Sequence, residues 1–155
     1  ARGSYLLFID TDMVFPEDAA WRLYQTMQKG NLDILCGLFF TGYNPYSPAL
    51  FKPLPEEGEI DPEKLRYTDY PKDSLFPIGL CGMAFTLLSP AVTQKISKFP
   101  FRRIVGPRNL HGEDISFCVR AQAEGFKLWC DSSVKIGHLR SFTIDEESFQ
   151  KGSNR

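Results

Sequence analysis

Short apolar runs alternate with segments in which apolar residues recur at helical spacing. Residues 5–9 read Tyr-Leu-Leu-Phe-Ile and residues 33–40 read Asp-Ile-Leu-Cys-Gly-Leu-Phe-Phe, and these runs predict two buried strands. Between them, Pro16 and the two acids after it suit the first turn of a helix, and Gly30 suits its C-terminal cap. One face of this helix carries Ala20, Leu23, Tyr24 and Met27. The order strand, helix, strand predicts a right-handed βαβ unit.

The remainder of the chain continues this alternation after one long interruption. Residues 41–76 are rich in proline and tyrosine, and they predict a long loop without regular structure. Ser89 and Pro90 suit the N-cap and first position of a short helix that ends near residue 97. The other predicted elements are a strand at 82–88, a helix at 113–124 closed by Gly125, short strands at 126–130 and 134–136, and a polar tail from Asp145.

Composition narrows the class of protein. The chain has 155 residues, of which 43% are hydrophobic and 24% charged, as in a soluble single domain. The net charge of −1 offers no basic surface for nucleic acid, and no apolar run reaches the ~20 residues that span a bilayer. Four widely spaced cysteines without a CxxC pair favour buried reduced thiols in a cytoplasmic protein, although a disulfide stays open.

Asp10 and Asp12 are the first candidates for chemistry. They directly follow the apolar run at 5–9, and alternate residues of a strand point to the same side. Ligands of open α/β sheets bind at the carboxyl ends of the strands. Two adjacent carboxylates repel each other unless a cation balances them, and Mg²⁺ or Mn²⁺ favours such oxygen ligands. The pair therefore predicts a metal site, with a turn and helix cap as the structural alternative.

Glu113, Asp114 and His138 are the later candidates. Both acids stand at a predicted helix start, where the backbone N–H groups stabilise negative charge. One of these acids is a helix cap, or Asp114 is a general base. The helix terminus would lower the pKa of Asp114, whereas desolvation beneath a bound sugar would restore its basicity. His138 follows a short strand, and imidazole is an acceptable Mn²⁺ ligand beside carboxylates. A packed histidine is the alternative.

These motifs occur in the order Asp10-Thr-Asp12, Gly79-x-x-Gly82, Gly112-Glu-Asp114, Gly125-Phe-Lys-Leu-Trp-Cys-Asp131 and His138. In this order they resemble the GT-A fold glycosyltransferases, notably the large family 2 group, over roughly residues 5–138. The resemblance implies an α/β, Rossmann-like mixed sheet with flanking helices. It also implies a transfer of sugar from a nucleotide-sugar donor to a saccharide or other hydroxyl acceptor.

The resemblance assigns a role to each candidate. Asp12 would be the direct ligand of Mn²⁺ or Mg²⁺, Asp10 would contact the ribose or sugar beside the metal, and His138 would complete the metal shell. Asp114 would act as the catalytic base, with Glu113 as the other member of the acidic pair. Gly82 would lie under the donor sugar, where a missing side chain allows close approach.

The family's first, nucleotide-binding strands have no counterpart before Tyr5. We therefore expect a partial GT-A domain over residues 1–144 and a polar tail over 145–155. Either the chain is a fragment of a longer protein, or it has lost the nucleotide pocket. Without those strands, residues 5–9 would form an exposed apolar edge, which predicts self-association through that strand.

Two other functions remain open. The first is a haloacid-dehalogenase-like phosphatase, a group that also places DxD after an early strand and uses the first aspartate as nucleophile. Met13 and Val14 depart from its usual motif. The second is a non-catalytic carbohydrate-binding or remnant domain, with sugar stacked on the loop aromatics Tyr43, Tyr46, Phe51, Tyr67 and Tyr70. Metal-independent sugar binding would favour this last function.

Overall fold

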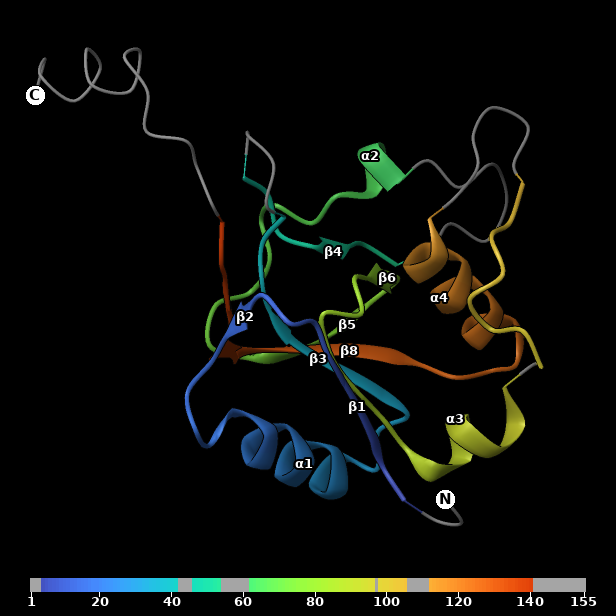
Figure 1. Cartoon of the computed structure of the whole chain (residues 1–155), viewed down its shortest axis with the longest axis horizontal. Helices are drawn as coiled ribbons and strands as arrows, with labels where there is room; N and C mark the ends of the chain where they lie inside the picture. The colour runs from blue at the N-terminus through green and yellow to red at the C-terminus, as the bar shows by residue number, and fades with distance from the viewer. Residues whose placement is uncertain (1–3, 42–45, 54–61, 97, 106–111, 141–155) are drawn as a thin grey trace, which may run out of the picture.

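The computed structural model describes residues 4–41, 46–53, 62–96, 98–105 and 112–140, which form a mixed α/β fold (Figure 1). The strands are β1 (Leu6–Ile9), β2 (Met13–Val14), β3 (Ile34–Leu38), β4 (Leu50–Phe51), β5 (Leu75–Ile78), β6 (Leu80–Cys81), β7 (Phe85–Leu88), β8 (Leu128–Lys135) and β9 (Gly137–His138). The helices are α1 (Ala19–Gly30), α2 (Pro62–Leu65), α3 (Pro90–Lys95) and α4 (Glu113–Ala123).

Five strands form a mixed sheet in the order β1-β7-β3-β8-β5. Strand β7 runs antiparallel to both β1 and β3, whereas β8 is parallel to β3 and antiparallel to β5. Two small pairs, β2 with β9 and β4 with β6, lie outside this sheet. The α/β class is confirmed. The expected strand-helix-strand unit is formed by β1, α1 and β3. Its two strands are not neighbours in the sheet, since β7 lies between them.

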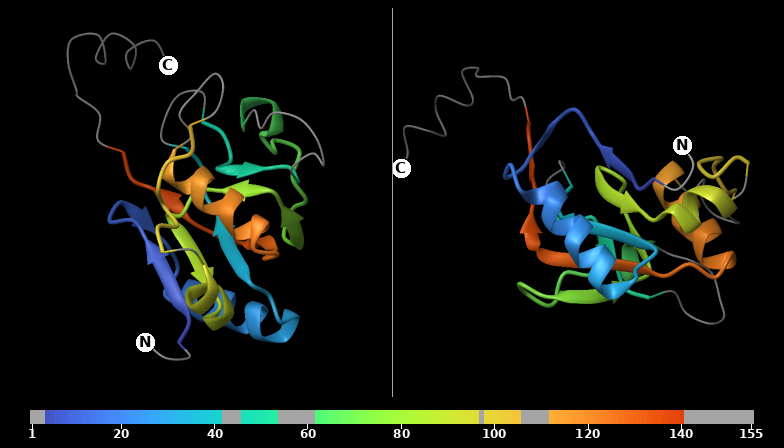
Figure 2. Two further views of the ribbon diagram at one scale, coloured as in Figure 1. Left: turned by 90° about the vertical axis from the view of Figure 1, so that its right-hand side faces the viewer. Right: turned by 90° about the horizontal axis from the view of Figure 1, so that it is seen from below.

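The core lies on both faces of the sheet because successive strand residues point to opposite sides. On β3, Ile34 and Cys36 belong to the cluster that includes side chains of α3 and α4. Leu35 belongs to the second cluster, which packs beneath α1. Figures 1 and 2 show α1 on one side of the sheet and α3 and α4 on the other. The flanking helices therefore complete a three-layer arrangement.

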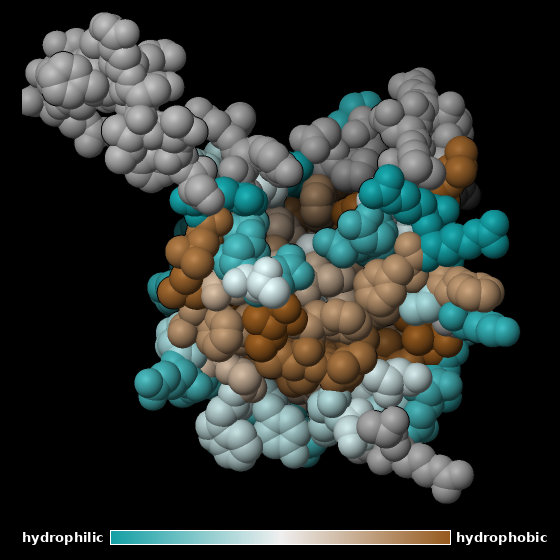
Figure 3. All heavy atoms as spheres, in the orientation of Figure 1, coloured by the Kyte–Doolittle hydropathy of each residue, from teal (hydrophilic) through white to brown (hydrophobic). Residues whose placement is uncertain are grey.

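Strand β1 is the edge of the sheet, as the expected loss of flanking strands predicted, whereas its apolar run taken alone predicted a buried strand. Its hydrogen-bonded neighbour in the sheet is β7, on one side. Leu6 and Ile9 at its ends are 45% and 44% exposed. In the orientation of Figure 1, apolar side chains gather on the face that carries β1 (Figure 3). The expected apolar edge is present, while the self-association that it predicts remains to be measured.

We expect Leu6→Lys to reduce self-association of the chain, because a lysine on an edge strand opposes pairing with a second strand. Sedimentation velocity over a range of concentrations measures this effect. Leu75→Lys is the matched control, since Leu75 is also exposed, at 40%, but lies on β5 at the opposite edge of the sheet. A wild-type chain that stays monomeric at the highest concentration would refute the prediction.

The helix boundaries differ from the sequence prediction in instructive ways. Helix α1 begins at Ala19 rather than Pro16, whose carbonyl accepts the Ala19 N–H at 2.9 Å. Its C-cap is Asn31 in the left-handed conformation, with φ of 47°, rather than Gly30. Asparagine tolerates this conformation, and the cap N–H is satisfied by carbonyls of the last turn. Helix α4 begins at Glu113 as predicted.

Two segments with weak sequence signals are more regular than predicted. The long segment after Thr41 contains β4 and α2, whereas a structureless loop was predicted. Strand β8 is continuous where two short strands were predicted, and its register against β3 shifts between Gly37 and Leu38. Pairing with distant strands, which no local pattern reveals, stabilises both segments. Residues 141–155, with the predicted tail, lie outside the described residues.

All four cysteines are free and buried, as the sequence predicted. They share one core cluster, in which Cys36 and Cys130 are register partners on β3 and β8. The hydrogen bond with Cys81 and burial raise the pKa of the Cys118 thiol well above its usual value. Such thiols stay protonated and unreactive.

In the described ranges, none of the helices combines the length and the apolar character that a bilayer span requires.

Candidate functional site

A cavity of about 310 Å³ is lined by residues of β4, β6 and the start of α4, elements that lie in the upper half of Figure 1. Residues from the early and late parts of the chain line it. They include Asp10, Phe40, Phe51, Arg66, Gly82, Glu113, Asp114, His138 and Arg140. The fold therefore brings Asp10, Gly82, both acids of α4 and His138 to one cavity, although they are spread over the sequence.

Asp10 and Asp12 lie in the turn between β1 and β2, not within a strand. The Asp10 N–H donates to Ala84 at 3.0 Å, and the Asp10 carbonyl accepts from Met13 at 3.2 Å. The turn separates the two carboxylates: Asp10 lines the cavity, and Asp12 reaches His138. The argument from strand alternation was therefore wrong, and the turn positions the pair instead.

His138 is held between a carbonyl and a carboxylate. Its Nδ1 lies 2.9 Å from the Phe40 carbonyl oxygen, and its Nε2 lies 3.0 Å from Asp12 Oδ2. A carbonyl only accepts, so we assign the Nδ1 proton to the bond with Phe40. If the ring is protonated, Nε2 donates an N–H to the Asp12 carboxylate. If the ring is neutral, Nε2 presents a lone pair to it. Two lone pairs at this distance repel each other unless a cation lies between them.

This arrangement fits a divalent cation. A histidine that ligates a metal usually donates its other ring N–H to a carboxylate, a backbone carbonyl or water, and the Phe40 carbonyl occupies this place at His138. In an octahedral site, two neighbouring ligand atoms lie about 2.1 Å from the ion, and the ligand–metal–ligand angle is a right angle. The two ligand atoms are then about 3 Å apart. The separation of Asp12 Oδ2 and His138 Nε2 is 3.0 Å. The described residues hold no group of three or more His, Cys, Asp or Glu side chains arranged for a metal. Substrate oxygens and water would supply the other positions.

The two acids at the start of α4 have different environments. The Glu113 carboxylate is more than half exposed and accepts two bonds from Arg103, at 3.0 and 3.2 Å. Its own backbone N–H, followed by Arg103, lowers the pKa of Glu113. Asp114 is half-buried, and burial raises the pKa of its carboxyl. The Met83 N–H, 3.2 Å from Oδ2, opposes this shift, while the charges of Glu113 and Asp10 add to it.

Burial therefore outweighs the hydrogen bond from Met83 and moves the pKa of Asp114 toward the range in which a general base works best. The sequence pattern left the direction of this pKa open, because a helix terminus lowers it and desolvation raises it. Glu113, by contrast, is paired with Arg103 and is the weaker base of the two.

Gly82 is needed for packing, since a Cβ there would lie 3.0 Å from two ring carbons of Phe39. A side chain at this position would displace that ring.

Sequence analysis missed Arg66, Arg140 and the carbonyl of Phe40. Arg140 Nη1 lies 3.9 Å from Asp12 Oδ2, and its Nη2 lies 3.5 Å from His138 Nδ1. The spacing of two residues between His138 and Arg140 could have indicated that both side chains point to the same side, as alternate residues of an extended chain do. Arg66 follows a short helix in a proline-rich segment and has no such signal.

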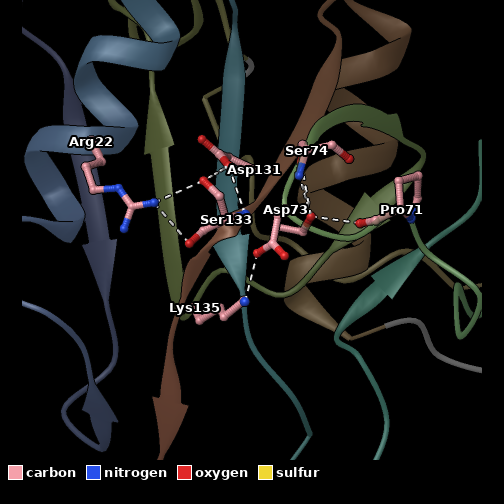
Figure 4. Close-up of polar contacts among 8 residues, drawn as sticks. Arg22, Pro71, Asp73, Ser74, Asp131, Ser133 and Lys135 are labelled. Atoms are coloured by element: carbon pink, nitrogen blue, oxygen red, sulfur yellow. Dashed lines mark hydrogen bonds and ion pairs between the residues drawn. The ribbon is translucent and has the colours of Figure 1, made fainter.

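A polar network holds β8 where its register shifts (Figure 4). Asp131 Oδ1 accepts from the backbone N–H and the hydroxyl of Ser133, at 3.0 and 2.6 Å. Arg22 of α1 donates to the carbonyl and hydroxyl oxygens of Ser133, both at 3.1 Å. Asp73 and Lys135 form an ion pair at 2.8 Å nearby (Figure 4). The irregular strand then continues to β9, where His138 pairs with Met13 of β2.

No protein-family model and no curated protein matches the chain. A solved structure, the crystal structure of A197 from STIV, shares the fold with a TM-score of 0.60 and 20% sequence identity. The likeness covers 89% of this chain and 59% of that chain. The chain thus spans less than two thirds of the length of this neighbour. At this identity the likeness shows a mixed α/β fold and nothing about activity.

Proposed function

We propose that the chain is the metal- and acceptor-binding part of a GT-A fold glycosyltransferase that uses a nucleotide-sugar donor. The observation that carries the proposal is the pair formed by Asp12 and His138 beside a cavity that also contains Asp10 and Asp114. The order of motifs along the chain supports the same function. The mixed α/β fold is compatible with it.

Each side chain has a distinct part in this function. Asp12 and His138 would hold Mn²⁺ or Mg²⁺, with Asp10 beside them in the cavity. The ion, when bound, would neutralise charge on the departing nucleoside diphosphate. Asp114 would accept the proton of the acceptor hydroxyl, since its half-buried carboxylate faces the cavity and has a raised pKa. The Met83 N–H fixes the orientation of that carboxylate.

Packing of the loop aromatics disfavours the non-catalytic alternative, in which they form a sugar-stacking surface. Phe51 and Tyr70 are 7% and 8% exposed, and Tyr67 packs edge-on against Phe76 at 5.5 Å. Tyr46 is the exposed member, and Tyr43 lies outside the described residues. The phosphatase alternative stays a prediction that aryl phosphate hydrolysis can test.

Binding of diphosphates in the presence and absence of metal tests the proposal. We expect UDP, GDP and inorganic pyrophosphate to bind the chain with Mn²⁺ present, and binding to be lost after EDTA treatment. The physical reason is that a divalent cation held by Asp12 and His138 would offset the negative charge of the diphosphate, which the acidic site would otherwise repel. Isothermal titration calorimetry gives both affinities. Diphosphate binding that is equally strong without metal contradicts the proposal, and so does hydrolysis of an aryl phosphate.

A further inference from the structure

Basic residues are concentrated in one part of a chain whose overall charge is −1. No acidic residue stands between Asp73 and Glu113, and every lysine and arginine of this interval falls within residues 95–108. Those that the structure describes are Lys95, Lys98, Arg102 and Arg103. The near-neutral total therefore conceals a local excess of positive charge.

The basic side chains are exposed and lie next to exposed apolar ones. Phe99 and Val105, in the segment that follows α3, are 62% and 80% exposed. The Lys98 ammonium lies 5.7 Å from the centre of the Phe99 ring. Figure 3 shows hydrophilic and hydrophobic side chains side by side on the margin that carries α3 and this segment in Figure 1. We call the exposed side chains of Lys95, Lys98, Phe99, Arg102, Arg103 and Val105 the basic surface.

Contacts with α4 hold the segment in a defined arrangement. The Phe101 ring stacks on the Phe117 ring at 4.9 Å, and the Pro100 carbonyl accepts from Arg120 Nη1 at 3.2 Å. Phe101 thereby packs against the main hydrophobic cluster, whereas Phe99 points outward. The basic surface is therefore preformed, and one aromatic side chain of the segment remains available for a partner.

The acids of α4 reduce the positive charge of the basic surface without cancelling it. Glu113 pairs with Arg103 at 3.0 Å. Within the described ranges, the other three cations of the surface form no ion pair. Asp114 lines the cavity, and Glu124 is the C-cap at the far end of the helix. An approaching anionic surface would therefore be attracted.

We propose that the basic surface docks on an anionic lipid bilayer. The lysine and arginine side chains would contact the headgroups, and Phe99 would enter the interface between headgroups and acyl chains. Such a contact is peripheral and needs no spanning helix. Nucleic acid is the competing polyanion, but the aliphatic Val105 offers it neither a hydrogen bond nor a ring for stacking. The inference goes beyond the proposed function and does not depend on it.

Sedimentation of the chain with lipid vesicles tests the inference. One set of vesicles is phosphatidylcholine alone, and the other is an equimolar mixture of phosphatidylcholine and phosphatidylserine. We expect the chain to bind the mixed vesicles and to stay in the supernatant with the neutral ones. Because attraction between exposed charges is screened by ions, added salt should release the bound chain.

The double variant Lys98→Gln/Arg102→Gln should bind the mixed vesicles about 25-fold more weakly, since each cation near an anionic bilayer contributes about fivefold. Lys29→Gln/Lys72→Gln is the matched control, which removes the same charge from exposed lysines of α1 and of the segment before β5. We expect the control to keep most of the binding. Circular dichroism establishes that each variant is folded.

Phe99→Ser should weaken binding to the mixed vesicles about tenfold, because an aromatic side chain no longer leaves water. Trp21→Ser is the matched control, since Trp21 is 58% exposed but belongs to α1, on the other side of the sheet (Figure 2). If the double variant fails to fold, Phe99→Ser and the salt series decide.

Three results would overturn the inference. The first is equal binding, or none, to the two kinds of vesicle. The second is an equal loss of binding in a variant of the basic surface and in its matched control. The third is a single-stranded RNA that binds the same residues more tightly than the vesicles do, because the surface would then serve nucleic acid. Metal-dependent diphosphate binding is measured separately and is unaffected by any of these results.

Discussion

Asp12→Ala is expected to lower the affinity of the chain for Mn²⁺ by about 100-fold or more, since even partners outside the ligand shell contribute ~10–100-fold. The carboxylate lies 3.0 Å from His138 Nε2, so its removal leaves the imidazole as a single ligand of that pair. Electron paramagnetic resonance of free Mn²⁺ measures the loss. The fold should persist, because Asp12 is part of an exposed turn and the backbone bond from Leu139 to the Asp12 carbonyl remains.

The specificity of this effect is testable with neighbouring substitutions. Glu17→Ala removes an exposed acid a few residues later and should leave Mn²⁺ affinity unchanged. His138→Ala should weaken binding about as much as Asp12→Ala, and the double variant should add little, because residues that act on one ligand are not additive. Equal affinities for the wild-type chain and Asp12→Ala would exclude Asp12 as a metal ligand, and with it the proposed metal site.

Asp114→Asn is expected to lower sugar transfer by about 10²–10⁴-fold, the usual contribution of a general base. Asparagine keeps an oxygen that accepts from Met83 N–H but cannot take a proton from the acceptor. Glu113→Gln is the control, with a smaller expected effect, because that carboxylate is exposed and paired with Arg103. Transfer from a panel of UDP- and GDP-sugars to sugar acceptors provides the measurement. Full activity of Asp114→Asn would exclude the assigned role.

The pH dependence of stability gives an independent test of Asp114. Burial raises its pKa in the folded chain, so the folded state binds the proton more tightly than the unfolded state. This stabilising contribution is complete below the ordinary aspartate pKa and is lost as pH rises through the raised value. Relative to the wild-type chain, Asp114→Asn should therefore gain unfolding free energy across that window. Urea denaturation at a series of pH values measures it. A difference between the two proteins that is constant with pH would contradict a raised pKa.

Much of the fold was predictable because its signals are local. The apolar run of β3 and the acidic start of α4 at Glu113 were located from residue type and spacing alone. The first helix was placed correctly, but its ends were wrong by one to three residues, since Asn31 rather than Gly30 adopts the left-handed cap. Element boundaries depend on backbone hydrogen bonds that a sequence pattern does not specify.

The membership of the candidate site was predicted better than its internal geometry. Asp10, Gly82, Asp114 and His138 do line one cavity. Their expected arrangement was less accurate, because the two early aspartates lie in a turn and point to different neighbours. The sequence left the direction of the Asp114 pKa open. That direction depends on burial by residues that are distant in sequence, and burial is a property of the folded chain.

By itself, the sequence determined the α/β class, the approximate helices and strands, the buried thiols and the set of acidic residues with His138 that form the candidate site. These follow from the local spacing of residue types. Only the tertiary structure decided that β7 lies between β1 and β3, that the Phe40 carbonyl orients His138 toward Asp12, and that Arg66 lines the same cavity. Each of these depends on contacts between segments far apart along the chain, and strand pairing and burial establish such contacts only when the chain folds.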